Sequence, residues 1–193
     1  MLKTYDMIID DLSSYANPKM KLQRQVHDGE YIPVKKELYE TSAEVPGHLL
    51  AACIYGPSYL SFDFALSWYD LIPERVSTFT SATFDKKKKK IYHTAFGVFT
   101  FRDVPRKVFP LGIREESEKG LFFQIASPEK ALCDKLYSIK RLSNRRELIQ
   151  VLEADLRIDT ESLRELNVSD IDELSRLYRS NNVRLLAAYM RRI

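Results

Sequence analysis

The sequence contains few of the residues on which most catalytic and metal-binding signatures depend. Its 193 residues include only 2 cysteines, 3 histidines and 6 glycines. His27, His48 and His93 are not spaced with cysteine or acidic residues as a metal site requires, so we expect surface or half-buried imidazoles. No glycine precedes a serine, and the phosphate-binding loop, the dinucleotide fingerprint and the serine nucleophile elbow are all absent. These absences predict a chain without metal, cofactor or enzymatic activity.

Long apolar runs are also lacking. No stretch approaches the ~20 apolar residues that a membrane-spanning helix needs, and Met1 to Asp11 carry acidic residues in place of a signal-peptide layout. Cys53 and Cys133 lie far apart in apolar contexts, which predicts two reduced and buried thiols. We therefore expect a cytoplasmic protein with no membrane partner.

Positive charge is present only in modest excess, and it is unevenly distributed. The net charge is +3 for the chain, −2 for residues 1–46, +4 for residues 47–140 and +1 for residues 141–193. A nucleic-acid surface in the N-terminal part must therefore be a local patch, because that part is not basic as a whole.

The first 45 residues have the pattern of a small winged-helix unit. Residues 4–14 read as a short helix, and Asn17-Pro18 begins a second helix that ends before Gly29. Residues 31–34 and 38–41 read as the two strands of a hairpin. Two helices followed by a hairpin outline a winged-helix-like unit over residues 1–45, with a larger domain over residues 46–193.

The larger domain alternates strand and helix signals in an order typical of an α+β fold. Residues 59–69 read as a buried helix, and residues 76–83, 91–104 and 121–125 read as strands of an antiparallel sheet, the first two joined as a hairpin. The chain is predicted to be helical from Ser127 onward, with the later helices beginning near Asn144, Thr160, Ser169 and Asn182.

The second predicted helix divides its side chains between two faces. Leu22 and Val26 share an apolar face, whereas Met20, Gln23, Arg24 and His27 lie opposite. Glutamine and arginine can form bidentate contacts with adenine and guanine in the major groove, and nearby lysines can hold phosphates. The alternative is an ordinary amphipathic helix with a solvated polar face.

The lysine run admits two interpretations as well. Lys86, Lys87, Lys88, Lys89 and Lys90 form either the solvated tip of the predicted hairpin or a clamp on phosphates. The run also begins an Asp-x-Lys pattern at Asp85, which together with Asp63 or Asp70 could form a Mg²⁺ site of a nuclease. A solvated loop accounts for the same residues.

Three blocks of sequence resemble the AbiEi antitoxin family of AbiE abortive-infection toxin–antitoxin systems. They are GPSYLSFDFALSWYDLIPE at residues 56–74, TAFGVFTFRDVP at 94–105 and IASPEKALCDKL at 125–136. The third block is the most specific, and its residues have structural roles. Ser127 and Pro128 begin a helix, and the negative charge of Glu129 complements the positive N-terminal end of that helix. Lys130 is the next residue of the motif. These motif residues are therefore expected to mark the fold.

The resemblance implies an antitoxin that represses its own operon by binding inverted repeats in operator DNA. It also implies a nucleotidyltransferase toxin as functional partner without a stable complex, antitoxicity carried by the C-terminal domain, and a chain that can be monomeric in solution. Carried over residue by residue, the DNA contacts fall on Lys19, Lys21, Gln23, Arg24, Gln25, Lys35 and Lys36.

The sequence departs from the family in two places. About one helix of the three-helix winged unit is missing or reduced, and Glu37 stands where the family often has glycine before the Leu-Tyr of the wing. Three hypotheses remain open: an antitoxin and repressor, a family member that acts only through its C-terminal domain, and a metal-dependent nuclease built on Asp85.

Overall fold

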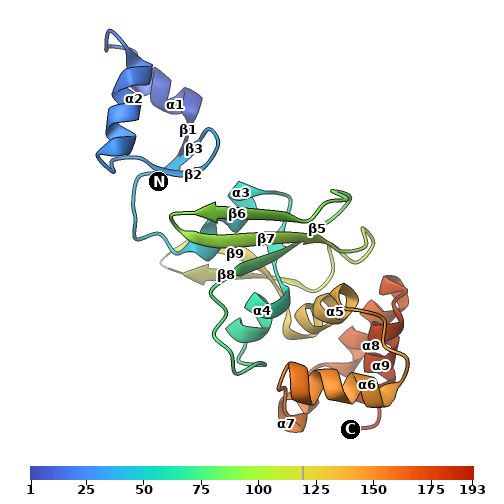
Figure 1. Cartoon of the computed structure of the whole chain (residues 1–193). Helices are drawn as coiled ribbons and strands as arrows, with labels where there is room; N and C mark the ends of the chain where they lie inside the picture. The colour runs from blue at the N-terminus through green and yellow to red at the C-terminus, as the bar shows by residue number, and fades with distance from the viewer. Residues whose placement is uncertain (119) are drawn as a thin grey trace.

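The computed structural model describes residues 1–118 and 120–193 and has an α+β architecture. A helix–hairpin unit lies at one end of the molecule and the C-terminal helices at the other, with a six-stranded sheet between them (Figure 1). Among the described residues, none of the helices combines the length and the apolar character needed to cross a bilayer.

The N-terminal unit contains the two helices and the hairpin that the sequence predicts. Its elements in chain order are β1 (Leu2–Thr4), α1 (Tyr5–Asp11), α2 (Pro18–His27), β2 (Ile32–Lys35) and β3 (Leu38–Glu40). The three strands form an antiparallel sheet in the order β1-β3-β2, in which β1 was not predicted because three residues carry no readable alternation. The cap of α2 is confirmed, since the Asn17 side chain accepts a hydrogen bond from the Met20 amide at 3.1 Å.

The turn between β2 and β3 forces Glu37 into a left-handed backbone conformation, with φ at +61°. A side chain with a Cβ atom is strained there, whereas glycine adopts this region freely. The Glu37 amide carbonyl also accepts a hydrogen bond from the Tyr5 amide at 3.0 Å, so this turn fixes the start of α1.

Glu37→Gly is therefore expected to raise the free energy of unfolding of the N-terminal unit by about 0.5–1 kcal/mol. Gly29→Ala is the matched control, because Gly29 has φ +79° with nothing within 4 Å of a built Cβ, so only the backbone strain changes. Thermal unfolding followed by circular dichroism should show the two variants shifted in opposite directions. A Glu37→Gly protein less stable than the wild type would contradict the strain assigned to this turn.

The larger domain that follows the N-terminal unit, predicted over residues 46–193, is called the body below. It contains a six-stranded sheet in the order β6-β7-β5-β4-β9-β8. Its strands are β4 (Tyr59–Leu60), β5 (Phe79–Thr83), β6 (Lys90–Thr94), β7 (Gly97–Asp103), β8 (Ile113–Glu118) and β9 (Leu121–Ala126). The prediction of an antiparallel sheet is wrong in part, because β5 pairs with β7 and β4 pairs with β9 in parallel. The sheet is mixed, and the α+β class is confirmed.

Two further differences between the predicted and the observed strands lie around the lysine run. Residues 91–104 form two strands, β6 and β7, joined by a tight turn and paired with each other. Because β7 returns between β6 and β5, the lysine run connects two strands that are not neighbours, and the predicted hairpin does not exist. A third difference is that Tyr59 and Leu60, expected to be helical, form β4, and the helix begins only at Phe62.

Helices cover the sheet and complete the core. They are the short helix η1 (Gly47–Leu50), α3 (Ala51–Ile54), α4 (Phe62–Trp68), α5 (Pro128–Ser138), α6 (Arg145–Gln150), the wider turn η2 (Val151–Asp155), α7 (Thr160–Arg164), α8 (Val168–Tyr178) and α9 (Asn181–Met190). The predicted helix starts after residue 127 are confirmed within two residues. Val34 of β2 belongs to the large body cluster, whereas Ile8, Leu12 and Leu22 form a separate small cluster.

Two expectations about reactive side chains require correction. Cys133 is buried as predicted, but Cys53 is exposed, because α3 turns Ala51 and Ile54 toward the core and Cys53 away from it. His48 is buried, not half-buried: its ring packs between Trp68 and Phe123, and its Nε2 lies 3.0 Å from the Glu118 carboxylate. Burial lowers the pKa of His48, and Glu118 opposes that shift.

Candidate nucleic-acid interface

The outer face of α2 carries the side chains that the sequence assigns to base recognition. Leu22 is buried against the first helix, which leaves Gln23, Arg24 and His27 exposed on the opposite side. These three residues border a shallow depression of about 420 Å³ together with Met20 and Asp28. The helix therefore presents adjacent amide and guanidinium groups outward, which is what contact with base edges requires.

The other predicted contacts on α2 do not all join this face. Lys19 is exposed on the first turn, whereas Lys21 is half-buried and lies over the Tyr15 ring, 5.5 Å from its centroid. Gln25 points away, because its Nε2 donates a hydrogen bond to Glu30 at 2.7 Å. At about 100° per residue, a helix turns Gln25 by roughly 200° from Gln23, so the structure does not place Gln25 with the other residues of the predicted DNA-contacting set.

The two hairpin lysines also behave differently from each other. The Lys35 ammonium donates to the backbone carbonyls of Cys53 and Ile54, at 2.7 and 2.8 Å, where α3 ends. The prediction that Lys35 holds phosphate is therefore not supported by its geometry, since its donors satisfy the C-terminal carbonyls of α3. The Lys36 side chain is 90% exposed and points to solvent, 3.7 Å from Glu37.

Lys35 thus connects the N-terminal unit to the body by hydrogen bonds, and removing its ammonium should expose the segment between them to protease. Lys35→Met should accelerate cleavage after Glu44 by a glutamate-specific endoprotease several-fold, because the hairpin loses its charged hydrogen bonds to α3 and opens more often. Lys36→Met is the matched control, since it removes an equal charge from the same hairpin without touching α3. Equal cleavage rates for the two variants would show that Lys35 does not hold the units together.

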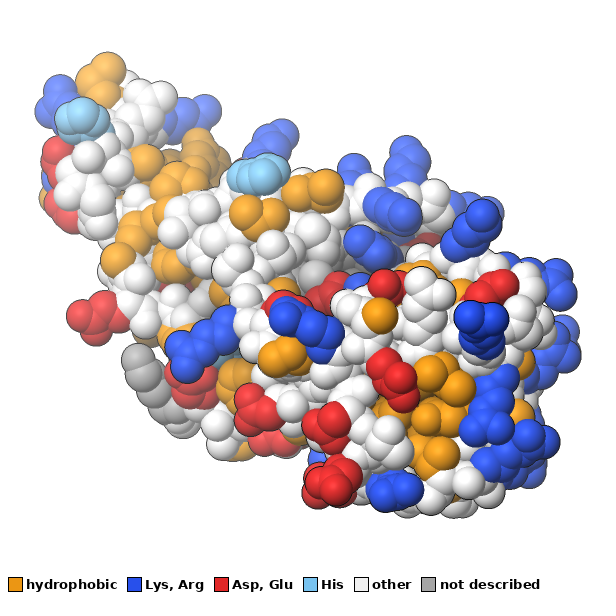
Figure 2. Space-filling view, turned by 60° about the horizontal axis from the view of Figure 1, so that its bottom comes forward, with side chains coloured by type: hydrophobic (Ala, Val, Ile, Leu, Met, Phe, Trp, Pro, Cys, Tyr) orange, Lys and Arg blue, Asp and Glu red, His pale blue; other side chains and the backbone are white. Residues whose placement is uncertain are grey.

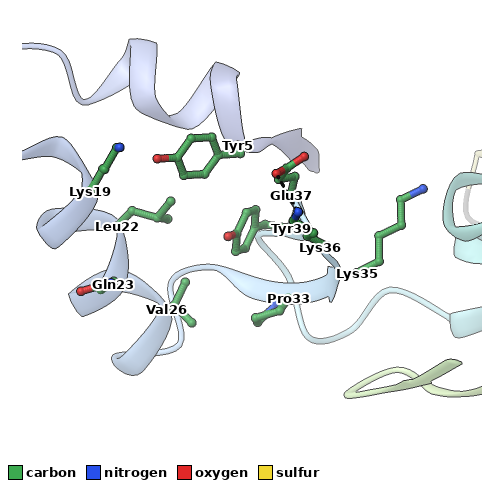
Figure 3. Close-up of a pocket in the computed structure, with 10 residues that line it drawn as sticks. All are labelled: Tyr5, Lys19, Leu22, Gln23, Val26, Pro33, Lys35, Lys36, Glu37 and Tyr39. Atoms are coloured by element: carbon green, nitrogen blue, oxygen red, sulfur yellow. Dashed lines mark ion pairs between the residues drawn. The ribbon is translucent and has the colours of Figure 1, made fainter.

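A groove runs between α1, α2 and the hairpin, with a volume of about 580 Å³. Figure 3 shows Tyr5, Leu22, Val26 and Tyr39 pointing toward its centre from three different elements, while Lys35 points out of it toward the body. Its other lining residues, at the rim and on the hairpin, are Lys19, Gln23, Pro33, Lys36 and Glu37.

The five lysines of the run do not act as one group. Lys86 folds back to donate to the Gly56 carbonyl at 3.1 Å and lies over the Tyr55 ring, and Lys90 is part of β6. Lys87, Lys88 and Lys89 are exposed and border a depression of about 450 Å³ together with Arg102, Asp103, Tyr137 and Ser138. Lys90 is exposed as well but does not border this depression, so three of the five lysines of the predicted phosphate clamp gather there.

Arginines from the C-terminal helices extend this positive surface. Tyr137, which is 38% exposed, also borders a second depression that contains Arg141, Arg179 and Arg184. Arg179 and Arg184 continue into a third depression with Arg176 and Arg191, although Arg191 is paired with Asp172. Lys and Arg side chains gather on the side of the molecule that carries these helices (Figure 2). We call Lys87, Lys88, Lys89, Arg102, Arg141, Arg176, Arg179 and Arg184 the basic band.

The family-motif residues lie inside the body. Ser127 caps α5 by accepting from the Lys130 amide at 3.2 Å, and Pro128 occupies the first helical position. Glu129 is buried, and its Oε1 accepts a hydrogen bond from the Asn167 amide at 3.0 Å at the start of α8. The motif therefore joins the start of α5 to α8.

Lys130 belongs to a buried polar network centred on Asp134. The Asp134 carboxylate accepts hydrogen bonds from Ser61 Oγ at 2.6 Å, from Tyr59 at 3.0 Å and from Tyr178, and lies 3.3 Å from the Lys130 ammonium. Lys130 also donates to the Tyr178 hydroxyl at 2.7 Å. Burial lowers the pKa of Lys130, with Asp134 opposing, and it raises the pKa of both tyrosines. The network ties α5 to β4 and α8 and has no exposed member.

The carboxylates of the nuclease hypothesis are engaged separately. Asp85 pairs with Arg106 at 3.2 Å, and Asp63 pairs with Lys135 at 2.5 Å. In the part of the chain that the structure describes, no group of three histidine, cysteine or acidic residues is placed to hold a metal ion. The structure thus brings together the basic groups but not the Asp85-centred site.

Comparison with protein-family models and with curated proteins finds no match to this chain. Its function is therefore inferred from the surfaces described above.

Proposed function

We propose that this protein is the antitoxin and autorepressor of an AbiE-type toxin–antitoxin operon, and that it binds operator DNA through its N-terminal unit. The observation that carries the proposal is the outer face of α2, where Gln23 and Arg24 are exposed above a buried Leu22. Lys19 on the first turn of α2 and Lys36 on the hairpin flank that face with exposed ammonium groups. This combination of groups suited to base and phosphate contacts, on a helix and an adjacent hairpin, supports the proposal of a winged-helix reader.

The order of the small sheet adds support. Strand β3 lies between β1 and β2, so the hairpin is anchored to the strand that precedes α1. The hairpin turn therefore has a fixed position relative to both helices, as a wing needs if it is to contact the backbone beside the recognition helix. Two copies on an inverted repeat would place two α2 helices in successive major grooves.

The basic band offers phosphate contacts outside the N-terminal unit. Lys87, Lys88 and Lys89 are exposed, and neutralising phosphates with lysine and arginine releases counterions and raises affinity regardless of sequence. In the proposed repressor this band adds affinity, whereas α2 adds specificity. The proposal further assigns the body an antitoxic effect against a nucleotidyltransferase toxin without a stable complex, and a cytoplasmic location.

The experiment is a fluorescence titration of the full chain against its own upstream region and against a shuffled duplex of equal composition, at a fixed salt concentration. A specific repressor should prefer its operator by roughly 10³-fold or more. Equal affinity for the two duplexes contradicts the repressor. If the same chain still relieves toxicity when co-expressed with the neighbouring toxin, the family member that acts only through its body is the correct alternative.

A further inference from the structure

The N-terminal unit leaves part of its own apolar interior uncovered. All of residues 1–41 are described, and their separate buried cluster consists of Ile8, Leu12 and Leu22. Around it Tyr5, Val26 and Tyr39 remain half-buried and line the groove between α1, α2 and the hairpin. A unit of about 40 residues rarely buries enough surface to be stable alone, so an open face is costly to leave in water.

The walls of the groove indicate what fills it. Helices form two sides and the hairpin the third, and the ring of Tyr39 stands between them (Figure 3). The edges of the small sheet are β1 and β2, and of these strands only Pro33 and Lys35 line the groove. Proline has no amide hydrogen to pair with an extended peptide, so this edge is a poor site for an added strand. A helix instead inserts apolar side chains at i, i+3 or i+4 and i+7 into an apolar groove of this kind. The volume of about 580 Å³ lies in the range of sites that bind ligands or side chains specifically.

The positive charge on the rim of the groove indicates that the bound helix is acidic. Lys19 stands at one end of the groove and Lys36 on the hairpin, and both are exposed. The Lys36 side chain is 90% exposed and forms a solvent-exposed ion pair at 3.7 Å with Glu37, the acidic group of the rim. The ammonium of the third rim lysine, Lys35, donates its hydrogen bonds to the carbonyls at the end of α3. Lys19 and Lys36 are therefore the two rim lysines whose ammonium groups face a ligand in the groove. Rim charges select partners of opposite sign and steer their approach.

From these observations we propose that the groove is a docking site for an amphipathic helix of a partner protein, with an apolar stripe that covers Leu22, Val26 and Tyr39 and with acidic flanks that face Lys19 and Lys36. The partner helix completes the core of the N-terminal unit. Since Lys19, Gln23 and Lys36 also belong to the proposed DNA-contacting face, a docked acidic helix excludes DNA; this consequence rests on the proposed function, whereas the docking itself does not.

The test uses the full chain and a fluorescein-labelled 14-residue helical peptide with leucines at i, i+3, i+4 and i+7 and glutamates on both flanks. Two control peptides carry lysines on the flanks, or the same residues with the stripe scrambled. Fluorescence anisotropy should show that the glutamate peptide binds at least about tenfold more tightly than either control, a difference of about 1.4 kcal/mol. Binding of all three peptides with equal affinity, or of none, overturns the proposal.

A variant with reversed rim charges tests the site without disturbing the core, because both substituted side chains are exposed. Lys19→Glu/Lys36→Glu changes only exposed side chains, and it should reverse the preference toward the lysine peptide, while Lys86→Glu should leave it unchanged. Val26→Gln should weaken both peptides. If the charge-reversed variant keeps the original preference, the groove is not the site. If the wild type instead forms a dimer that Val26→Gln dissociates, the occupant is a second copy of the chain and the partner helix is overturned. The docking can hold even where the operator titration shows no specific DNA binding.

Discussion

Replacing Asp134 by alanine is expected to lower the free energy of unfolding by about 3–5 kcal/mol. The substitution leaves the fully buried Lys130 ammonium without its counter-charge, and it removes the acceptor shared by the hydroxyls of Tyr59, Ser61 and Tyr178. Uncompensated buried charges and unpaired buried hydroxyls are among the most destabilising lesions in a core. Urea unfolding followed by Trp68 fluorescence measures the change.

Two further variants separate the charge from the packing. Lys130→Met removes the buried cation and leaves Asp134 with its three hydroxyl donors, so we expect a smaller loss than for Asp134→Ala. The double variant Lys130→Met/Asp134→Leu replaces the pair by apolar groups and should recover much of the loss, because a buried ion pair is seldom more stable than a well-packed apolar replacement. An Asp134→Ala protein within about 1 kcal/mol of the wild type would contradict a structural role for the network.

Replacing Lys87, Lys88 and Lys89 together by alanine is expected to flatten the salt dependence of DNA binding. If each lysine neutralises one phosphate, the slope of log K against log salt should decrease in magnitude by about 2.7, or about 0.9 for each contact. The loss should be alike for operator and shuffled DNA, since phosphate contacts carry no sequence information. Titrations at several salt concentrations give the slope.

Lys86→Ala is the matched control for the triple variant. It removes a lysine of the same run, but Lys86 donates to the Gly56 carbonyl and lies over Tyr55, so it is not available to a phosphate. We expect the slope of Lys86→Ala to equal that of the wild type. A triple variant with an unchanged slope would show that the lysine run is only a solvated connection between β5 and β6.

Features that depend on neighbouring residues could be predicted from the sequence. Asn17 and Ser127 each combine an oxygen-bearing side chain with a following proline, and both cap helices as expected. The hairpin around Glu37 was predicted because its signals are also local. Such features need no knowledge of distant strands, since capping and turn geometry are decided within a few residues.

Features that depend on distant pairing could not be predicted. The residues of β5 do not indicate that this strand pairs with β7 and not with β6, the next strand along the chain. Parallel pairing has no local sequence signature, because the two strands are joined by a long connection. The same holds for Lys35, whose partners Cys53 and Ile54 lie 18 and 19 residues away, and for Asp134, which meets Tyr59 and Tyr178 from two other elements. The arginines of the basic band come from β7, from the connection after α5 and from the ends and turns of α8 and α9. The near-neutral net charge of residues 141–193 conceals how four of them, Arg141, Arg176, Arg179 and Arg184, gather on one side.

The central claim is that α2 reads operator DNA, and the ratio of the affinities for operator and shuffled duplex tests it most directly. Gln23→Ala and Arg24→Ala should each weaken operator binding by about 1–3 kcal/mol and change binding to shuffled DNA little, because their contacts are to bases. Gln25→Ala is the control on the same helix, since its amide is held by Glu30. The account predicts that the ratio falls for Gln23→Ala and Arg24→Ala but not for Gln25→Ala. A ratio unchanged in all three variants, or already equal to one in the wild type, would contradict it.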